Sequence, residues 1–331
     1  MKQSGLFVIS LDFELMWGMK DVATPEGYGM SHVARVPHVI NRLLELFANY
    51  QVHATFGTVG LIMLQGVEDA LQRWPASLPT YNNPELSPYE DNYMANISQA
   101  IEPLFFAPKT VGKLAQAEGV EVGTHTFGHF YCDAQGQTKD QFESDLIRAI
   151  EVALERDIVF RSIIFPRNNV SKDYLEICHK HGVDVYRGNA KKYFEKTTGR
   201  LDALKQRICR LVDAYVNLGG YTSHKVENLK SEVDGMVNVP ASRLLRPFSP
   251  RLAFAERIRL RRIKKEMVYA AQHGELYHLW WHPHNFGQNL EKNMLFLEKV
   301  LSQFVYCRER YGMQSCTMAE AADIIRKHNN Q

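Results

Sequence analysis

The chain has 331 residues, 45% of them hydrophobic, which is enough for a large core in one or two domains. A net charge of +2 gives no bulk attraction to nucleic acid, and no apolar run approaches the roughly 18 residues of a membrane span. Five cysteines are scattered without a CxxC pair, which indicates reduced thiols and argues against a cysteine zinc site. The apolar run at the N-terminus is too short for a signal peptide, so we expect a cytoplasmic protein.

Short β-rich runs alternate with helical patterns along the chain. The predicted strands are 6–12, 52–60, 120–124, 161–166, 183–188, 275–282 and 313–318. The predicted helices are 36–50, 142–156, 171–182, 289–311 and 319–328. This alternation predicts an α/β fold with a largely parallel sheet, and seven or eight strands favour a barrel over an open sheet. In either case functional groups gather at the carboxyl ends of the strands.

Two segments interrupt the alternation within what we expect to be one domain, 1–331. Residues 74–108 contain six prolines and three tyrosines, which predicts an insertion or a lid-like loop outside the core. Residues 216–250 are also irregular, and neither segment contains a repeat or a low-complexity tract.

An acid pair ends the first predicted strand, where the sequence reads LDFE. Asp12 and Glu14 stand two residues apart, so both carboxylates point to one face of a strand while Phe13 points to the other. Two charges are buried only where a cation or hydrogen bonds compensate them. The alternative interpretation is a strand end whose acids are solvated.

Two histidines, His125 and His129, follow the third predicted strand in the stretch GTHTFGHF. On a helix such a pair would share a face, but the flanking glycines and Thr124 favour a strand end that leads into a turn. A lone histidine is most often structural, whereas two histidines at one strand end and two acids at another favour a metal site. Two neutral imidazoles and a carboxylate are a common ligand set of catalytic zinc.

Two further strand ends carry candidate catalytic groups. The stretch LWWHPHNFG places His282 and His284 at the end of the strand 275–282, and a histidine there can act as a general acid near neutral pH. His284 could equally be a surface residue without a role. The stretch FPRNN ends another strand with Arg167, which is suited to hold a carboxylate; its alternative is a surface ion pair.

The ordered set of these motifs resembles the polysaccharide deacetylase superfamily, which comprises metal-dependent sugar N- and O-deacetylases, over about residues 6–325. HTFGH matches the H-[ST]-x-x-H motif, so the resemblance makes His125 and His129 metal ligands. ATFGTVG, LWWHP and CTMAEAADII resemble three further motifs, and the second of them makes His282 the catalytic acid. The resemblance implies a distorted (β/α) barrel of seven or eight strands and a divalent metal, zinc above all.

The first motif departs from the family pattern. Where the family usually reads T-F-D-D-G, this chain reads SLDFE, as in the D-x-E branches. The resemblance assigns Asp12 as the catalytic base and Glu14 as the third metal ligand, with an exchange of their roles as the alternative. FPRNN is a reduced form of the R-x-P-Y motif and makes Arg167 the residue that orients Asp12. The later Asp-Trp motif has no counterpart.

The basic segment 243–265 bears on the substrate. It contains nine arginines or lysines and one acid, Glu256. A solvated helix face is one interpretation, and a grip on phosphate or a peripheral contact with a membrane is the other. Because a cytoplasmic deacylase meets nucleotide-linked and lipid-linked sugars, we expect an activated amino sugar, a precursor of O-antigen or capsule, that loses an acetyl or formyl group.

Three other functions fit parts of the pattern. One is an allantoinase-like hydrolase of cyclic amides, from another branch of the same superfamily. A second is a glycosidase that uses Asp12 and Glu14 as its carboxylate pair and needs no metal. A third is a catalytically inactive sugar-binding module, which the degenerate motifs would allow.

Overall fold

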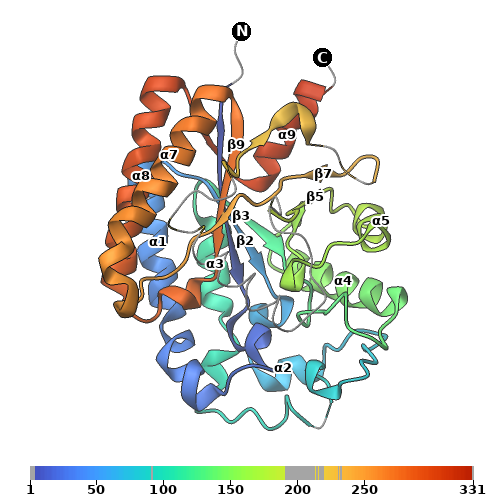
Figure 1. Cartoon of the computed structure of the whole chain (residues 1–331). Coiled ribbons are helices and arrows are strands. Elements are labelled where there is room, and N and C mark those ends of the chain that lie inside the picture. Colours follow the sequence, from blue (N-terminus) through green and yellow to red (C-terminus); the bar gives the residue numbers. More distant parts are fainter. Residues whose placement is uncertain are drawn as a thin grey trace, which may run out of the picture.

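The computed structural model describes residues 4–90, 92–190, 213, 215, 220–229, 231 and 233–329. A curved, mostly parallel sheet forms the centre of the molecule (Figure 1). Its strands are β1 (Leu6–Phe13), β2 (Ala54–Thr58), β3 (Val120–Thr124), β4 (Ser162–Ile163), β5 (Val185–Tyr186), β6 (His224–Lys225), β7 (Val237–Asn238), β8 (Arg243–Leu244), β9 (Glu275–Trp281) and β10 (Gln314–Cys316).

The sheet closes on itself. Its order is β6-β9-β1-β2-β3-β4-β5-β7, with β10 beside β1 and β8 beside β9, and among the described residues only the β6–β9 pair is antiparallel. The stretch from β7 to β8 bridges β5 and β9, since Val239 N donates to Tyr186 O at 2.9 Å and Ser242 N donates to His278 O at 2.8 Å. This connection confirms the predicted distorted barrel.

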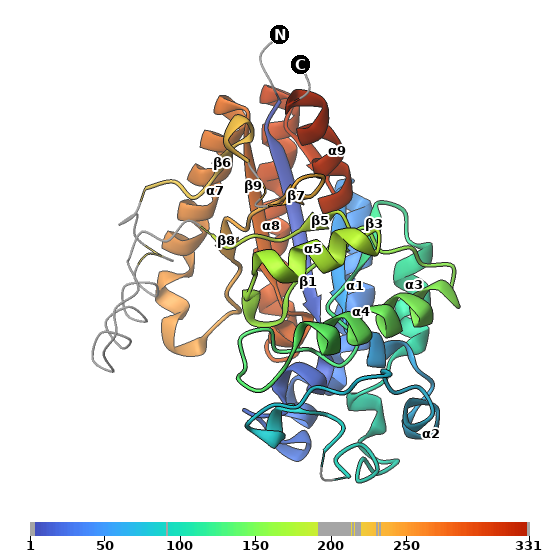
Figure 2. The same ribbon diagram turned by 90° about the vertical axis from the view of Figure 1, so that its right-hand side faces the viewer.

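Helices cover the outside of the barrel. On one side lie α1 (Val36–Tyr50), α7 (Glu256–His273) and α8 (Leu290–Tyr311), and on the opposite side α4 (Lys139–Leu154) and α5 (Lys172–Lys180) (Figures 1 and 2). The other α-helices of the described residues are α2 (Val67–Leu71), α3 (Pro108–Gln116) and α9 (Met318–Asn329). Among the described residues, none of these helices has the length and the apolar character needed to cross a bilayer.

The core is centred on β1. All eight of its residues are buried, as in a parallel strand with neighbours on both sides and helices over its face. Phe7 stacks on Phe304 of α8 with ring centroids 5.0 Å apart. The predicted helix 36–50 has the predicted bounds, and its apolar stripe, which includes Val39 and Leu43, is buried.

Residues 74–108 contain no strand and only short helical turns in the described part, as the prolines predicted. The expectation that they lie outside the core is wrong, because Tyr81, Met94 and Phe105 are all buried. Phe105 O accepts a hydrogen bond from the Trp17 indole at 2.7 Å. The segment therefore packs under the carboxyl end of the barrel, where the strand ends meet (Figure 1).

The irregular segment 216–250 contributes β6, β7 and β8 in its described part, so the stretch without a clear pattern supplies the closure of the barrel. Its strands are only two residues long, too short for a readable alternation. Of the five cysteines, Cys132, Cys178, Cys307 and Cys316 are unpaired and buried, and Cys209 lies outside the described residues.

Candidate metal centre and catalytic site

The carboxyl ends of three strands bring the predicted acids and histidines together. Asp12 is the second-last residue of β1, and Glu14 directly follows that strand. His125 and His129 follow β3, and His282 follows β9. Both members of the acid pair point to one face, because His282 Nε2 lies 3.7 Å from Asp12 Oδ2 and 3.4 Å from Glu14 Oε1.

Glu14 and the two histidines form a compact, buried group. Glu14 Oε2 lies 3.2 Å from His129 Nε2 and 3.5 Å from His125 Nε2. One ligand atom from each of the three residues lies within 4.8 Å of the other two. All three side chains are at most 6% exposed, so bulk water does not screen their charges.

The turn that carries the histidines is fixed by Asp145 of α4. The Asp145 carboxylate accepts hydrogen bonds from Phe127 N at 2.6 Å and Gly128 N at 2.9 Å. A Cβ atom at position 128 would come within 2.6 Å of the Tyr89 hydroxyl oxygen, so only glycine fits there. His129 adopts a left-handed φ of 57°, which turns its imidazole back toward His125. The predicted turn after a strand end is therefore present.

The group fits a divalent metal on its donor chemistry. His125 Nδ1 and Nε2 and His129 Nδ1 are buried without a hydrogen-bond partner among the described residues. Three such atoms on two neighbouring imidazoles beside a carboxylate need a partner, and a bound metal ion would supply it. Two imidazoles and one carboxylate are also the protein ligands of many catalytic zinc sites, which leave a fourth position open.

Asp12 is held by Arg187, which stands at the end of β5. Arg187 NH1 donates to Asp12 Oδ1 at 2.6 Å, and Arg187 NH2 donates to Oδ2 at 2.7 Å. Both side chains are buried, Arg187 completely. This two-pronged pairing is the geometry in which a guanidinium binds a carboxylate most strongly.

Further contacts fix the guanidinium of Arg187. It donates to Ser10 Oγ at 3.0 Å and to Asn168 Oδ1 at 2.8 Å, and its carbon lies 4.4 Å from the centre of the Trp280 ring. Ser10 Oγ in turn lies 2.8 Å from Nε2 of the buried His278. The orientation of Asp12 is therefore fixed by a network of side-chain contacts that links β1, β5 and β9.

The prediction that Arg167 orients Asp12 is wrong. The Arg167 guanidinium pairs with Asp21 and lies 4.4 Å from the centre of the Tyr131 ring, and its side chain is 43% exposed. The physical reason is local, since Arg167 follows Pro166 in a short helical turn with a left-handed φ of 56°, beyond the end of β4. Arg167 therefore stands at the rim of the site, and Arg187 takes the predicted role.

His282 stands between the acid pair and solvent. Its side chain is 24% exposed, and its Nδ1 lies 3.5 Å from the Asn285 amide nitrogen. An amide donor at Nδ1 favours the tautomer with the proton on Nε2, which faces the carboxylates. His284 stacks on His282 with ring centroids 4.9 Å apart, and it is buried, not a surface residue. Burial lowers the pKa of His284 to about 3, so its imidazole is neutral.

The electrostatics keep both carboxylates ionised. Burial by itself would raise the pKa of Asp12, but Arg187 and then His282 outweigh it and hold this pKa below its usual value. Burial likewise opposes ionisation of Glu14, whereas His282 and the two histidines of the turn lower its pKa well below normal. The pKa of His129 is lowered mainly by burial, which favours the neutral imidazole that a metal requires.

Two residues of the site were not predicted, although the sequence marks both. Arg187 is a single cation at the end of the predicted strand 183–188, the same argument that singled out Arg167. Asp145 is an acid on the buried stripe of α4, one residue before the buried Leu146. A charge on an apolar stripe needs a partner and so predicts a structural role.

Solved structures with the same architecture cover nearly the whole chain. A protein from Mycobacterium smegmatis that is assigned as a polysaccharide deacetylase is 14% identical, with a TM-score of 0.63 over 99% of this chain and 92% of that one. A Pseudomonas aeruginosa PAO1 protein with the same assignment is 13% identical, with a TM-score of 0.51 over 98% and 91%. Puue allantoinase is 10% identical, with a TM-score of 0.52 over 98% and 90%.

No family model matches the sequence. The curated proteins likewise contain no match to it. At identities this low the likeness concerns the fold, and the chain has an α/β barrel of the polysaccharide deacetylase type.

Proposed function

We propose that the protein is a metal-dependent hydrolase that removes an N-acyl group from an amino sugar. The observation that supports this proposal most strongly is the position of Asp12. It is held ionised by Arg187 at 2.6 and 2.7 Å and shares His282 with Glu14, which belongs to the metal-ligand group with His125 and His129. The fold of the polysaccharide deacetylases supports this assignment.

Each residue then has a distinct role. Glu14, His125 and His129 would hold a divalent ion, most simply zinc, and such an ion polarises a water molecule and an acyl carbonyl. Asp12 takes the proton of the attacking water on its carboxylate, and Arg187 orients that carboxylate.

His282 acts as the general acid. In its imidazolium form it donates the proton on Nε2, which faces Asp12 and Glu14, to the departing amine, and it is left as a neutral imidazole. Without this proton the amine leaves poorly. Because His282 is partly exposed, it can exchange its proton with solvent between turnovers.

The substrate class that we propose is a nucleotide-linked or lipid-linked amino sugar with an acetyl or formyl group, such as a precursor of O-antigen or capsule, processed in the cytoplasm. Arg167 supports a phosphate-bearing substrate, since it is an exposed cation over Tyr131, whose ring packs against the edge of His129 at 4.9 Å. A guanidinium there is placed to contact a phosphate outside the reacting group.

The two remaining catalytic alternatives have different support. The likeness to Puue allantoinase favours a cyclic amide hydrolase as the second candidate, since ring opening of an amide needs the same base and metal ligands. A glycosidase pair is disfavoured, because it needs one protonated carboxyl group as general acid, whereas the pKa values of Asp12 and Glu14 are both lowered by their neighbours, by Arg187 and His282 for Asp12 and by His282 and the two histidines of the turn for Glu14.

A screen for amine release tests the proposal. Purified protein loaded with zinc is incubated with free and diphosphate-linked N-acetyl and N-formyl amino sugars and with allantoin, beside the Asp12→Asn variant. We expect turnover of an activated amino sugar that a chelator abolishes and that the variant lacks. Full activity of metal-free protein would contradict it, and binding of glycan without turnover after metal is restored would identify an inactive binding module.

A further inference from the structure

Seven of the nine cations of the basic segment 243–265 form two sets in the structure, and Arg246 and Arg251 belong to neither. Arg243 and Arg262 bond to the buried Glu266 of α7 at 2.7 and 3.1 Å. Arg259 pairs with Glu256 at 2.6 Å and lies over the Phe296 ring at 3.8 Å. These three arginines are internal and cannot serve a ligand.

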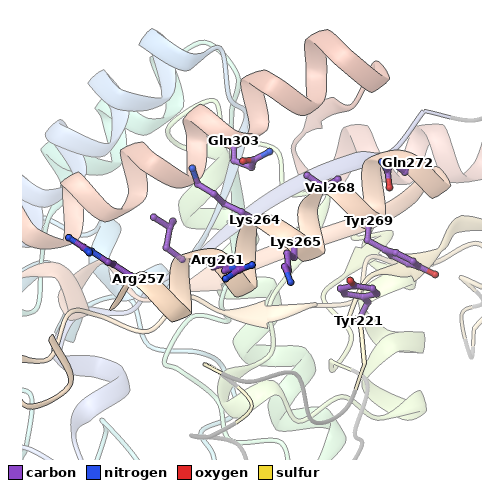
Figure 3. Close-up of a pocket in the computed structure, with 10 residues that line it drawn as sticks. Tyr221, Arg257, Arg261, Lys264, Lys265, Val268, Tyr269, Gln272 and Gln303 are labelled. Carbon is purple, nitrogen blue, oxygen red and sulfur yellow. The ribbon is translucent and has the colours of Figure 1, made fainter. Parts of the chain in front are cut away.

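Four other cations lie on the outer face of α7. Arg257, Arg261 and Lys265 follow one another at intervals of four residues and form an exposed stripe, with the half-buried Lys264 beside it (Figure 3). They line a groove of about 580 Å³. Among the described residues, no acidic side chain lines this groove and none of the four cations forms an ion pair.

Two large apolar side chains protrude beside this stripe. Phe254, just before α7, is 81% exposed, and Ile258 in its first turn is 50% exposed. A lone exposed apolar residue needs no explanation, but two of them beside uncompensated cations are typical of a helix that lies on a membrane surface. The apolar side chains enter the headgroup region and the cations bind the phosphates.

The position of Phe254 in the fold agrees with this orientation. Since β8 runs parallel to β9, the chain leaves it at the carboxyl end of the barrel, where His282 and the metal-ligand group lie. Residues 250–255 then lead into α7, which returns along the outside of the barrel (Figure 1). The protruding side chains therefore stand at the catalytic end.

We propose that the outer face of α7, with Phe254, Ile258 and the stripe Arg257–Arg261–Lys265, docks the protein on a bilayer that contains anionic phospholipid. Nucleic acid is the weaker fit, because the aromatic rings of the groove are occupied. Tyr221 and Tyr269 stack on each other at 4.2 Å, and Tyr269 stacks on His273 at 3.9 Å, which leaves little ring face for bases.

Co-sedimentation with vesicles tests this docking surface in the full-length protein. Vesicles of equal parts phosphatidylglycerol and phosphatidylcholine are compared with pure phosphatidylcholine, for the wild type, R261E/K265E and F254S/I258S. The matched control is K172E/K180E, which makes the same change of charge on the exposed face of α5, on the opposite side of the barrel (Figure 1).

We expect binding to the anionic vesicles alone, weakened by about 10-fold or more in R261E/K265E and further reduced by salt. F254S/I258S should also bind more weakly, and K172E/K180E should bind like the wild type. Equal binding to both vesicle types, no binding to either, or an equal loss in the control would overturn the proposal. So would capture of single-stranded RNA, but not vesicles, through the same two cations.

Vesicle binding requires no turnover, so this test is independent of the proposed hydrolase activity. If the proposed function also holds, R261E/K265E should hydrolyse a free soluble amino sugar as the wild type does. A protein that binds vesicles but hydrolyses nothing would contradict the proposed function and leave the docking surface intact.

Discussion

The charges at the carboxyl end of the barrel differ in burial and in ion pairing from the charges on the outer face of α7. Asp12 and Arg187 are both buried, and Arg187 donates hydrogen bonds to both oxygens of Asp12 and to Ser10 and Asn168. The stripe Arg257–Arg261–Lys265 is exposed and has no acidic partner among the described residues.

This difference separates charges that build a site from charges that are available to an external partner. A buried charge is tolerated only when a partner compensates it, so removal of one member leaves the other at a large penalty. An exposed cation is solvated, so its substitution leaves the fold unchanged.

The largest effect is expected from the metal ligands. His125→Ala or His129→Ala should remove the bound metal and lower kcat/KM by about 10³-fold or more, since a catalytic ion contributes several kcal/mol of transition-state stabilisation. Metal analysis and amine release measure the two losses. His38→Ala, at an exposed position of α1, is the matched control and should change neither.

Arg187→Met should destabilise the fold by about 3–5 kcal/mol, because it leaves Asp12 buried without its cation. Denaturant unfolding measures the loss, and Asp12→Asn/Arg187→Met should recover part of it. A double variant as unstable as the sum of both single variants would show that the two residues are not coupled.

The ion pair between Asp12 and Arg187 also predicts how the stability of the fold depends on pH. The pKa of Asp12 is depressed in the folded protein, so its contribution to stability is present above the unfolded pKa of about 4 and is lost as the pH falls through the folded pKa. The stability difference between the wild type and Arg187→Met should therefore shrink in acid. Its growth in acid would contradict the assigned ion pair.

Asp145 should show the opposite pH dependence. Burial raises its pKa to about 7, although the N–H groups of Phe127 and Gly128 lower it. In the unfolded chain this carboxyl ionises near pH 4, so the wild type should lose stability relative to Asp145→Asn as the pH rises from about 4 to 7. Unfolding midpoints at a series of pH values measure the difference, and parallel profiles for the two proteins would refute it.

Arg167→Ala should have the smallest effect. Its guanidinium is at the rim and pairs with Asp21, so kcat for a free amino sugar should change by less than about 10-fold and stability by at most about 1 kcal/mol. Steady-state kinetics beside Arg187→Met gives the comparison. An effect on kcat equal to that of Arg187→Met would restore Arg167 to the role that the sequence predicted.

The sequence was sufficient to predict those site residues that belong to short local motifs. His125 and His129 stand in one turn and Asp12 and Glu14 at one strand end, so their convergence follows from strand order alone. The bounds of α1 were also predictable, because a long apolar stripe at helical spacing decides them. Those of the short β3 agree with the predicted strand that follows Gly119.

The features that could not be predicted depend on contacts between segments that are far apart in the sequence. Arg187 reaches Asp12 across 175 positions, and nothing local distinguishes it from Arg167, which follows the neighbouring strand. The closure of the barrel through β7 and β8 depends on backbone hydrogen bonds of two-residue strands, and these leave no alternation in the sequence. The burial of 74–108 similarly arises from tertiary packing, which overrides the prolines and polar residues.

The division of roles between Asp12 and Glu14 tests the account most directly. The metal content of the purified protein is measured for the wild type, Asp12→Asn and Glu14→Gln. The geometry predicts about one ion per chain in the wild type, retention of the ion without activity in Asp12→Asn, and its loss in Glu14→Gln. Retention in Glu14→Gln together with loss in Asp12→Asn would contradict the assignment of Glu14 as the ligand and Asp12 as the base.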